Sequence, residues 1–191
     1  MVYRLASLTI PYARDGHSRE RAYEGIVRAG FTHVGLYDQH PEGPIWPADA
    51  DAAVARKAVQ PALDAGLSID HKSHGAVTGA PGEPERFLRA IDLAAESRVP
   101  ALVCWGPSEY GVGGFPEDPK FGPAWQAEID AFYRAFERGV RAAEVANVVL
   151  LPKPHTGIGK HGHSLRELYD RFRSDVIGVC YDTGNVHYYE G

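Results

Sequence analysis

Residues 150–157 read Leu-Leu-Pro-Lys-Pro-His-Thr-Gly, and residues 179–186 read Val-Cys-Tyr-Asp-Thr-Gly-Asn-Val. In each stretch a short apolar run ends in a charged residue, Lys153 in the first and Asp182 in the second. Apolar runs without polar alternation are typical of strands that are buried on both faces, as in parallel sheets. The two stretches therefore predict parallel strands with charged side chains at their carboxyl ends.

Working outward along the chain, the same unit recurs. Six short apolar runs occur, at residues 3–10, 33–37, 67–71, 101–105, 148–151 and 176–181. The segments between them carry helix signals, among them the N-cap residue Ser18, the first-turn residue Pro84 and a capping box that begins at Ser164. Residues 49–65 are also helical in pattern, and we expect Pro61 to kink or split that helix. Alternating strands and helices predict an α/β fold with a parallel sheet.

Two parallel architectures fit this order, an open doubly wound sheet and a (β/α) barrel. A dinucleotide-binding sheet carries Gly-x-Gly-x-x-Gly after its first strand, whereas residues 11–16 read Pro-Tyr-Ala-Arg-Asp-Gly. Polar and aromatic residues follow the apolar runs instead, namely Tyr37, His71, His74, Trp105, Lys153, His155, Asp182 and Asn185. Because (β/α) barrels build their sites at strand carboxyl ends, the sequence predicts a barrel of TIM type.

The predicted barrel is incomplete. A full barrel has eight units and about 250 residues, whereas the six units here predict one domain over residues 1–191 with about six parallel strands. An incomplete barrel leaves unpaired strand edges, so we expect a homo-oligomer formed through the open edge.

Composition narrows the range of partners. The 191 residues include 20 Lys and Arg against 25 Asp and Glu, a net charge of −5, which argues against nucleic acid as a partner. No apolar run is long enough to span a membrane, and the N-terminus lacks the pattern of a secretory signal. Cys104 and Cys180 lie in apolar runs without a Cys-x-x-Cys partner, so we expect buried free thiols and a cytoplasmic location.

The sequence resembles the xylose isomerase-like TIM barrels, a superfamily of sugar and sugar-phosphate isomerases and epimerases that also includes endonuclease IV. The resemblance rests on the two stretches quoted above, with Gly-Phe-Thr-His-Val-Gly-Leu at residues 30–36 and Ala-Gly-Leu-Ser-Ile at residues 65–69 in support. It extends over the whole chain and corresponds to the first three-quarters of the family's barrel. It implies a metal-assisted isomerase or epimerase that acts on a small sugar or sugar phosphate.

The resemblance also implies a metal site. In the family a divalent ion, often Mn²⁺, Mg²⁺, Co²⁺ or Zn²⁺, is held by Glu, Asp, His and Glu from the last four strands. Asp182 matches the strand-six Asp and is the expected metal ligand. Lys153 stands where the strand-five Glu is expected, and Asn185 stands where a substrate-binding His is expected. The strand-seven and strand-eight ligands have no counterpart in the sequence.

Lys153 and Asp182 are the predicted catalytic residues. Proton transfer next to a carbonyl needs a base and a group that stabilises the enediolate oxygen. Lys153 could act as a fixed cation for an enolate or a phosphate, form a Schiff base if burial lowers its pKa, or pair with Asp182. These three roles remain open at this point.

The remaining candidates are expected to bind substrate. They are Tyr37, His74, Trp105, His155 and Asn185. Each has a structural alternative: a surface pair for His71 and His74, and packing at the barrel rim for Trp105. Asp38, beside Tyr37, could bind a sugar hydroxyl or form an ion pair. His161 and His163 resemble a metal clip but fit a solvated loop, and residues 111–115 predict a mobile loop.

We therefore expect a sugar or sugar-phosphate isomerase or epimerase with a small-molecule substrate and no nucleic-acid or membrane partner. Two alternatives stay open, a lyase or dehydratase on the same scaffold and a truncated or non-catalytic sugar-binding barrel. An endonuclease is disfavoured, because the acidic chain offers no basic face for DNA.

Overall fold

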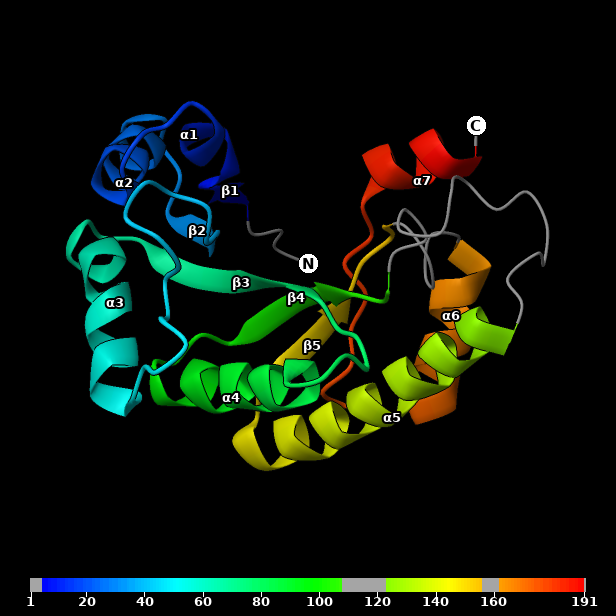
Figure 1. Cartoon of the computed structure of the whole chain (residues 1–191). Helices are drawn as coiled ribbons and strands as arrows, with labels where there is room; N and C mark the ends of the chain where they lie inside the picture. Colours follow the sequence, from blue (N-terminus) through cyan, green and yellow to red (C-terminus); the bar gives the residue numbers. More distant parts are fainter. Residues whose placement is uncertain (1–4, 108–122, 156–161, 191) are drawn as a thin grey trace. The chain divides into compact units, whose positions relative to one another are not determined.

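The computed structural model describes residues 5–107, 123–155 and 162–190 (Figure 1). The strands are β1 (Ala6–Leu8), β2 (His33–Leu36), β3 (Ser68–Ala76), β4 (Ala101–Trp105) and β5 (Val149–Pro152). The helices are α1 (Ile10–Arg14), α2 (Arg19–Arg28), α3 (Ala52–Asp64), α4 (Glu83–Glu96), α5 (Pro123–Ala146), α6 (Gly162–Phe172) and α7 (Thr183–Glu190). The strands form one sheet in chain order, with β1 parallel to β2 and β2 parallel to β3. The predicted α/β fold with a parallel sheet is confirmed.

The contacts between residues divide the chain into two compact units. The first comprises Met1–Ser73 and Asp92–Leu102, and the second comprises His74–Ile91 and Val103–Gly191. The prediction of a single domain stays a prediction. Among the described helices, none combines the length and the apolar character needed to cross a membrane.

In the first unit, helices pack on the start of the sheet through small and apolar side chains. The side chain of Ser18 accepts a hydrogen bond from the Arg21 amide at 3.2 Å, so the predicted N-cap of α2 is confirmed. Ile26 of α2 and Val34 of β2 are fully buried. α3 continues through Pro61 without a break, which corrects the expected split. Its first-turn capping and its buried apolar face outweigh the cost of one proline.

In the second unit, aromatic rings hold α4 to α5. The ring of Phe136 lies 6.1 Å from that of Phe87 and 5.5 Å from that of Phe132, measured between centroids. All three side chains are almost completely buried. Gly139 lies against Phe87 so closely that a methyl group at this position would overlap the ring. This aromatic cluster is the core of the second unit.

A recurring joint follows five of the described helices, α2 to α6, and the first four of these joints lead into a strand. At each joint a residue just after the end of the helix has a left-handed backbone. These residues are Gly30 (φ 88°), Gly66 (φ 82°), Arg98 (φ 59°), Asn147 (φ 54°) and Arg173 (φ 42°). At the first four joints the next amide donates to the carbonyl five residues earlier, as in Phe31 to Ile26 at 3.2 Å and Val99 to Ala94 at 2.8 Å. This is the Schellman arrangement, which ends the helix and turns the chain into the next strand.

The third and the sixth predicted strands differ from the observed elements. β3 extends through Ala76, so His71 and His74 lie within the strand and not in a loop after it. Residues 176–181 run alongside β5, with a parallel bridge between Leu150 and Ile177, but they are not assigned as a strand. The amide of Gly178 donates to the carbonyl of Leu150 at 2.9 Å, which continues the sheet's hydrogen bonding on that side. The sixth predicted run therefore pairs with β5 over a few residues only.

Candidate active site

Backbone pairing in the second unit brings Lys153 and Asp182 together. Lys153 follows directly after β5, and its amide donates to the carbonyl of Cys104 in β4 at 2.9 Å. On the other side of β5, the amide of Cys180 donates to the carbonyl of Pro152 at 2.9 Å. The side chains that follow these paired segments therefore gather at the carboxyl end of β5, where a barrel places its chemistry.

Lys153 and Asp182 form an ion pair. The Lys153 Nζ lies 3.0 Å from Asp182 Oδ2, and their side chains are 22% and 31% exposed. Asp182 Oδ1 accepts the amide of Asn185 at 3.0 Å, so Asp182 also caps the start of α7. Burial alone would raise the pKa of Asp182, but the Asn185 amide and the Lys153 ammonium hold that pKa below its ordinary value. Asp182 is therefore ionised, and both of its oxygens are engaged.

A stacked aromatic pair lies beside the ion pair. The rings of Trp105 and His155 are 4.7 Å apart between centroids and inclined by 14°. The Lys153 ammonium lies 5.9 Å from the centre of the same Trp105 ring. Burial, and then the charge of Lys153, lower the pKa of His155. The imidazole is therefore neutral at neutral pH and can accept a proton or a hydrogen bond.

Asn185 connects α7 to the segment after β5. Its side-chain nitrogen donates to the carbonyl of Pro154 at 2.6 Å, and its backbone amide donates to Asp182. The side-chain nitrogen is thus committed to the protein, and the side-chain oxygen is the atom that can accept from a substrate hydroxyl. Lys153, Asp182, Trp105, His155 and Asn185 are therefore one connected cluster.

The other two predicted substrate-binding residues have different surroundings. His74 is 8% exposed, and its ring lies 5.0 Å from Phe87 in the core of the second unit. Tyr37 belongs to the first unit, where its amide donates to the hydroxyl oxygen of Thr9 at 3.1 Å. Their roles in substrate binding stay predictions.

Lys72 is a buried charge that the sequence analysis did not single out. It is 3% exposed, and its ammonium donates to Asp38 Oδ2 at 2.6 Å and to the carbonyl of Ser73 at 2.9 Å. It also lies 5.0 Å from the centre of the Trp46 ring. Of the two roles expected for Asp38, a sugar contact or an ion pair, the structure shows the ion pair. A lysine next to a predicted strand, with an acid just past the end of the neighbouring strand, was the available signal.

The described residues do not supply a complete metal site. In residues 5–107, 123–155 and 162–190, no group of three or more His, Cys, Asp or Glu side chains is placed to hold a metal ion. In the cluster itself, Asp182 is the one carboxylate, and Lys153 occupies its Oδ2. A divalent ion ordinarily needs three or more N or O ligands, so this cluster alone does not fit one. The metal stays a prediction.

The remaining predictions concern the glycine-rich stretch, the expected histidine clip and the two cysteines. Residues 111–115 and His161 lie outside the described residues, and His163 is exposed near the start of α6. Both cysteines are free; Cys104 is buried, and Cys180 is half-buried. Burial raises the pKa of the Cys104 thiol, so this thiol stays protonated.

Comparison with known proteins agrees with this arrangement. The sequence model of the family described as "xylose isomerase-like TIM barrel" matches residues 24–191. The chain belongs to the xylose isomerase-like TIM barrel family. The resemblance inferred from the sequence is thus confirmed, together with the TIM-barrel type of this chain's fold. No curated protein matches the sequence.

Solved structures of xylose isomerase-like barrels superpose well on the chain. The probable 3-DHS dehydratase AsbF from Bacillus anthracis matches with a TM-score of 0.69 at 12% identity, covering 99% of this chain and 66% of its own. An L-ribulose 3-epimerase matches with a TM-score of 0.66 at 16% identity, covering 100% and 64%. The 3-keto-D-glucoside 4-epimerase YcjR from E. coli matches with a TM-score of 0.63 at 12% identity, covering 88% and 64%. At these identities the likeness shows the fold, and the chain spans slightly less than two thirds of each solved chain.

Proposed function

We propose that this xylose isomerase-like barrel catalyses proton transfer next to the carbonyl of a small polyhydroxylated substrate, as sugar and sugar-phosphate isomerases and epimerases do. The observation that supports this is the Lys153–Asp182 ion pair beside the neutral imidazole of His155 at the carboxyl end of β5. Two of the solved structures with a similar fold are named as epimerases, which supports this chemistry on the scaffold.

In this proposal Lys153 stabilises the charge that develops on the substrate. Removing the proton next to a carbonyl moves its C–H electron pair into a C=C bond and leaves negative charge on the carbonyl oxygen. A fixed ammonium beside that oxygen stabilises the enolate more than the neutral ketone, which lowers the barrier. Of the roles left open for Lys153, its pairing with Asp182 favours a fixed cation, because the carboxylate lies 3.0 Å from Nζ and holds the charged side chain in place.

Asp182 and His155 would divide the remaining work. The depressed pKa of Asp182 makes it a weak base, so its role is to hold the Lys153 side chain in place. The imidazole of His155 is neutral, so it is the better proton acceptor within the cluster. Isomerisation follows when a proton is delivered to the former carbonyl carbon and the hydroxyl proton of the neighbouring carbon passes to the enolate oxygen. Epimerisation follows when the original carbon takes a proton from water on its opposite face and His155 releases its own proton to solvent.

The substrate would be held by the remaining members of the cluster. Trp105 and His155 together offer an apolar surface for the C–H face of a sugar, and the side-chain oxygen of Asn185 can accept from a hydroxyl. A divalent metal at Asp182 would polarise the substrate's oxygens, but none of the steps above depends on it.

Hydrogen exchange into substrate tests the proposal directly. The 191-residue chain is incubated in D₂O with ketoses, ketose phosphates and their epimers, and deuterium at the carbon next to the carbonyl is followed by NMR. We expect incorporation that Lys153→Met reduces by a factor of about 10²–10³, the loss typical of a group that stabilises an oxyanion. Lys57→Met, at an exposed lysine of α3, is the matched control.

The same experiment separates the alternatives. A dehydratase would release water after the same proton abstraction and give an unsaturated product. The solved structure of AsbF is named as a probable dehydratase. A non-catalytic sugar-binding barrel would show line broadening of a sugar without deuterium in it. Exchange that is unaffected by Lys153→Met would refute the assignment of Lys153, and no exchange with any substrate would refute the proposed activity.

A further inference from the structure

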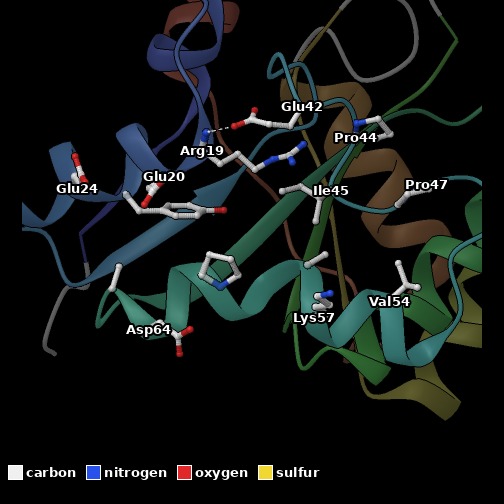
Figure 2. Close-up of a pocket in the computed structure, with 14 residues that line it drawn as sticks. Arg19, Glu20, Glu24, Glu42, Pro44, Ile45, Pro47, Val54, Lys57 and Asp64 are labelled. Atoms are coloured by element: carbon white, nitrogen blue, oxygen red, sulfur yellow. Dashed lines mark hydrogen bonds between the residues drawn. The ribbon is translucent and has the colours of Figure 1, made fainter.

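The pocket of the first unit has a lining of mixed charge. It has a volume of about 940 Å³ and lies between α2, residues 42–47 and α3 (Figure 2). Its charged lining residues are Glu20, Glu24, Glu42, Asp64, Arg19 and Lys57. Figure 2 shows acidic and basic side chains interspersed around the pocket, so the lining selects neither an anion nor a cation. The feature that extends the proposed function lies in the second unit.

Gly75, near the end of β3, has a backbone conformation that residues with a side chain rarely adopt. Its φ is 107°. The residues on either side of it are anchored in the core, because the ring of His74 lies against Phe87 and the side chain of Val77 is buried. At such a φ a Cβ is crowded by the residue's own backbone, so glycine is the residue that fits. The path of the chain from His74 to Val77 therefore depends on the absence of a side chain at Gly75.

Trp105 of the candidate site is held by this part of β3. Its Cη2 and Cζ2 atoms lie 4.0 Å from the position that a Cβ of Gly75 would take, so the edge of the indole ring borders Gly75. The backbone of Trp105 is bound to the same segment, because the amide of Val77 donates to its carbonyl at 2.8 Å. All three residues belong to the second unit. Residues 75–77 thus contact Trp105 at both its ring and its carbonyl.

We propose that Gly75 is a positioning residue of the candidate active site and that it acts through Trp105. The Trp105 ring stacks on His155 at 4.7 Å and lies 5.9 Å from the Lys153 ammonium. A shift of this ring therefore moves the imidazole and changes the surroundings of the cation. The importance of this for catalysis rests on the proposed function, in which His155 takes the proton, because proton transfer is sensitive to the placement of the base.

NMR of the two stacked rings tests the proposal without a substrate. Alanine cannot hold a φ of 107° without strain, so Gly75→Ala shifts the segment that borders Trp105. We expect weaker nuclear Overhauser effects between the Trp105 and His155 rings. Because burial is the first cause of the lowered pKa of His155, we also expect that pKa to rise toward its ordinary value of about 6.5.

Gly82→Ala is the matched control. Gly82 has a left-handed φ of 82° and belongs to the second unit, but a Cβ there would have no neighbouring atom within 4 Å. This variant also strains the backbone, so it is expected to lower stability while it leaves the pKa of His155 unchanged. Gly75→Asn is a milder second variant at the proposed position, because asparagine tolerates a positive φ better than alanine does. It is expected to raise the pKa of His155 in the same direction.

A double-mutant cycle with Trp105→Ala separates positioning through the ring from a general loss of stability. If Gly75 acts through Trp105, Gly75→Ala adds little to the change in the pKa of His155 that Trp105→Ala produces alone. A full additional change in the double variant would overturn the proposal. Equal changes in Gly75→Ala and Gly82→Ala, or an unchanged pKa of His155 in both Gly75 variants, would overturn it as well.

The deuterium exchange assay connects this position to catalysis. We expect Gly75→Ala to lower the exchange rate by up to about 10²-fold, the loss that follows from moving a reacting group by about 1 Å, and Gly82→Ala to leave the rate unchanged. An unchanged exchange rate in Gly75→Ala would refute a positioning role in the reaction. If the wild type shows no exchange, the proposed function fails, and the NMR of His155 still decides whether Gly75 positions Trp105.

Discussion

At the scale of single residues, Asp182 connects a helix cap to a lysine. One oxygen receives the Asn185 amide and the other receives the Lys153 ammonium. The hydrogen bond from the Asn185 amide fixes the Asp182 carboxylate. The Lys153 ammonium therefore pairs with an acceptor that already has a defined position. The position of the cation next to His155 and Trp105 thus depends on the first turn of α7.

Removing the cation is expected to raise two pKa values at once. In Lys153→Met, Asp182 loses a favourable charge, so the pKa of its carboxyl rises, although the Asn185 amide still holds it down in part. His155 loses a like charge, so the pKa of its imidazole rises as well. Titration of the two side chains by ¹³C-edited NMR measures both shifts. Unchanged values for both would mean that the ion pair does not form in solution.

The depressed pKa of His155 also predicts a dependence of stability on pH. Because the folded state disfavours the charged imidazole, its contribution is fully present above the unfolded pKa of about 6.5 and is lost as pH falls through the lower folded value. Urea unfolding of the wild type and His155→Gln at pH 8 and pH 5 isolates this effect. We expect acidification to destabilise the wild type more than His155→Gln, and parallel losses would contradict the assignment.

At the scale of elements, the Lys72–Asp38 pair ties β3 to the segment that follows β2. Asp38 Oδ1 accepts the amide of Ile45 at 2.9 Å, so the same carboxylate also shapes the segment leading to α3. The Lys72 side chain is 4% exposed, so the Asp38 carboxylate balances a charge that is almost completely buried. The pair therefore belongs to the framework of the first unit.

Removing Asp38 alone is expected to lower the free energy of unfolding more than removing Asp38 and the charge of Lys72 together. Asp38→Ala leaves Lys72 as a buried uncompensated charge, which typically destabilises by about 3–5 kcal/mol. The double variant with Lys72→Met removes that charge, so part of the stability is expected to return. Chemical unfolding of the wild type, both single variants and the double variant completes the cycle. Additive losses would show that the two side chains do not interact.

Close packing of α5 on α4 makes a second prediction. Alanine favours helices by about 1 kcal/mol over glycine, but a methyl group at Gly139 would overlap Phe87. Gly139→Ala is therefore expected to destabilise by about 1–3 kcal/mol through overpacking. Thermal unfolding measures the change, with Val145→Ala, at a 92% exposed position of α5, as the control. A gain in stability would show that the helices can separate at no cost.

The sequence predicted the longer elements well because their apolar residues recur at the spacing of strands or helices. It predicted β2, β4 and α3 near their observed bounds. It missed α1 and α7, since five- and eight-residue helices carry too few turns for a periodic pattern. It ended β3 too early, because His71 and His74 are polar residues in a strand whose environment only the fold defines.

At the scale of the whole molecule, the chain spans slightly less than two thirds of its solved relatives. The residues of the candidate site were predicted from their places after strands, and five of them form one cluster. Their mutual contacts were not predictable, because sequence spacing does not fix which oxygen of Asp182 meets Lys153. Lys72 was missed because its burial depends on Asp38 and Trp46, which are distant in sequence.

Metal binding is a prediction that can be tested through the stability of the whole protein. If Mn²⁺, Mg²⁺, Co²⁺ or Zn²⁺ binds at Asp182, saturation at about 100 times its Kd stabilises the protein by about 2.7 kcal/mol. Thermal unfolding with and without each ion, alongside metal analysis of the purified protein, tests this expectation. Asp182→Ala is expected to abolish the shift, and a shift that persists in this variant would place the metal elsewhere.

Self-association also stays a prediction. β1 lies at one end of the strand order, and Leu5 and Leu8 beside and within it are 73% and 39% exposed. Exposed leucines on an edge strand favour pairing with another chain. The expected homo-oligomer would cover them.

The five left-handed joints have a consequence for engineering. Three of them use a residue with a side chain, Arg98, Asn147 and Arg173, where a left-handed backbone costs roughly 1 kcal/mol more than it does for glycine. Glycine at these positions relieves that cost and is expected to raise the melting temperature. None of the three residues belongs to the cluster of Lys153, Asp182, Trp105, His155 and Asn185, so heat tolerance can be adjusted without changing a side chain of the candidate site.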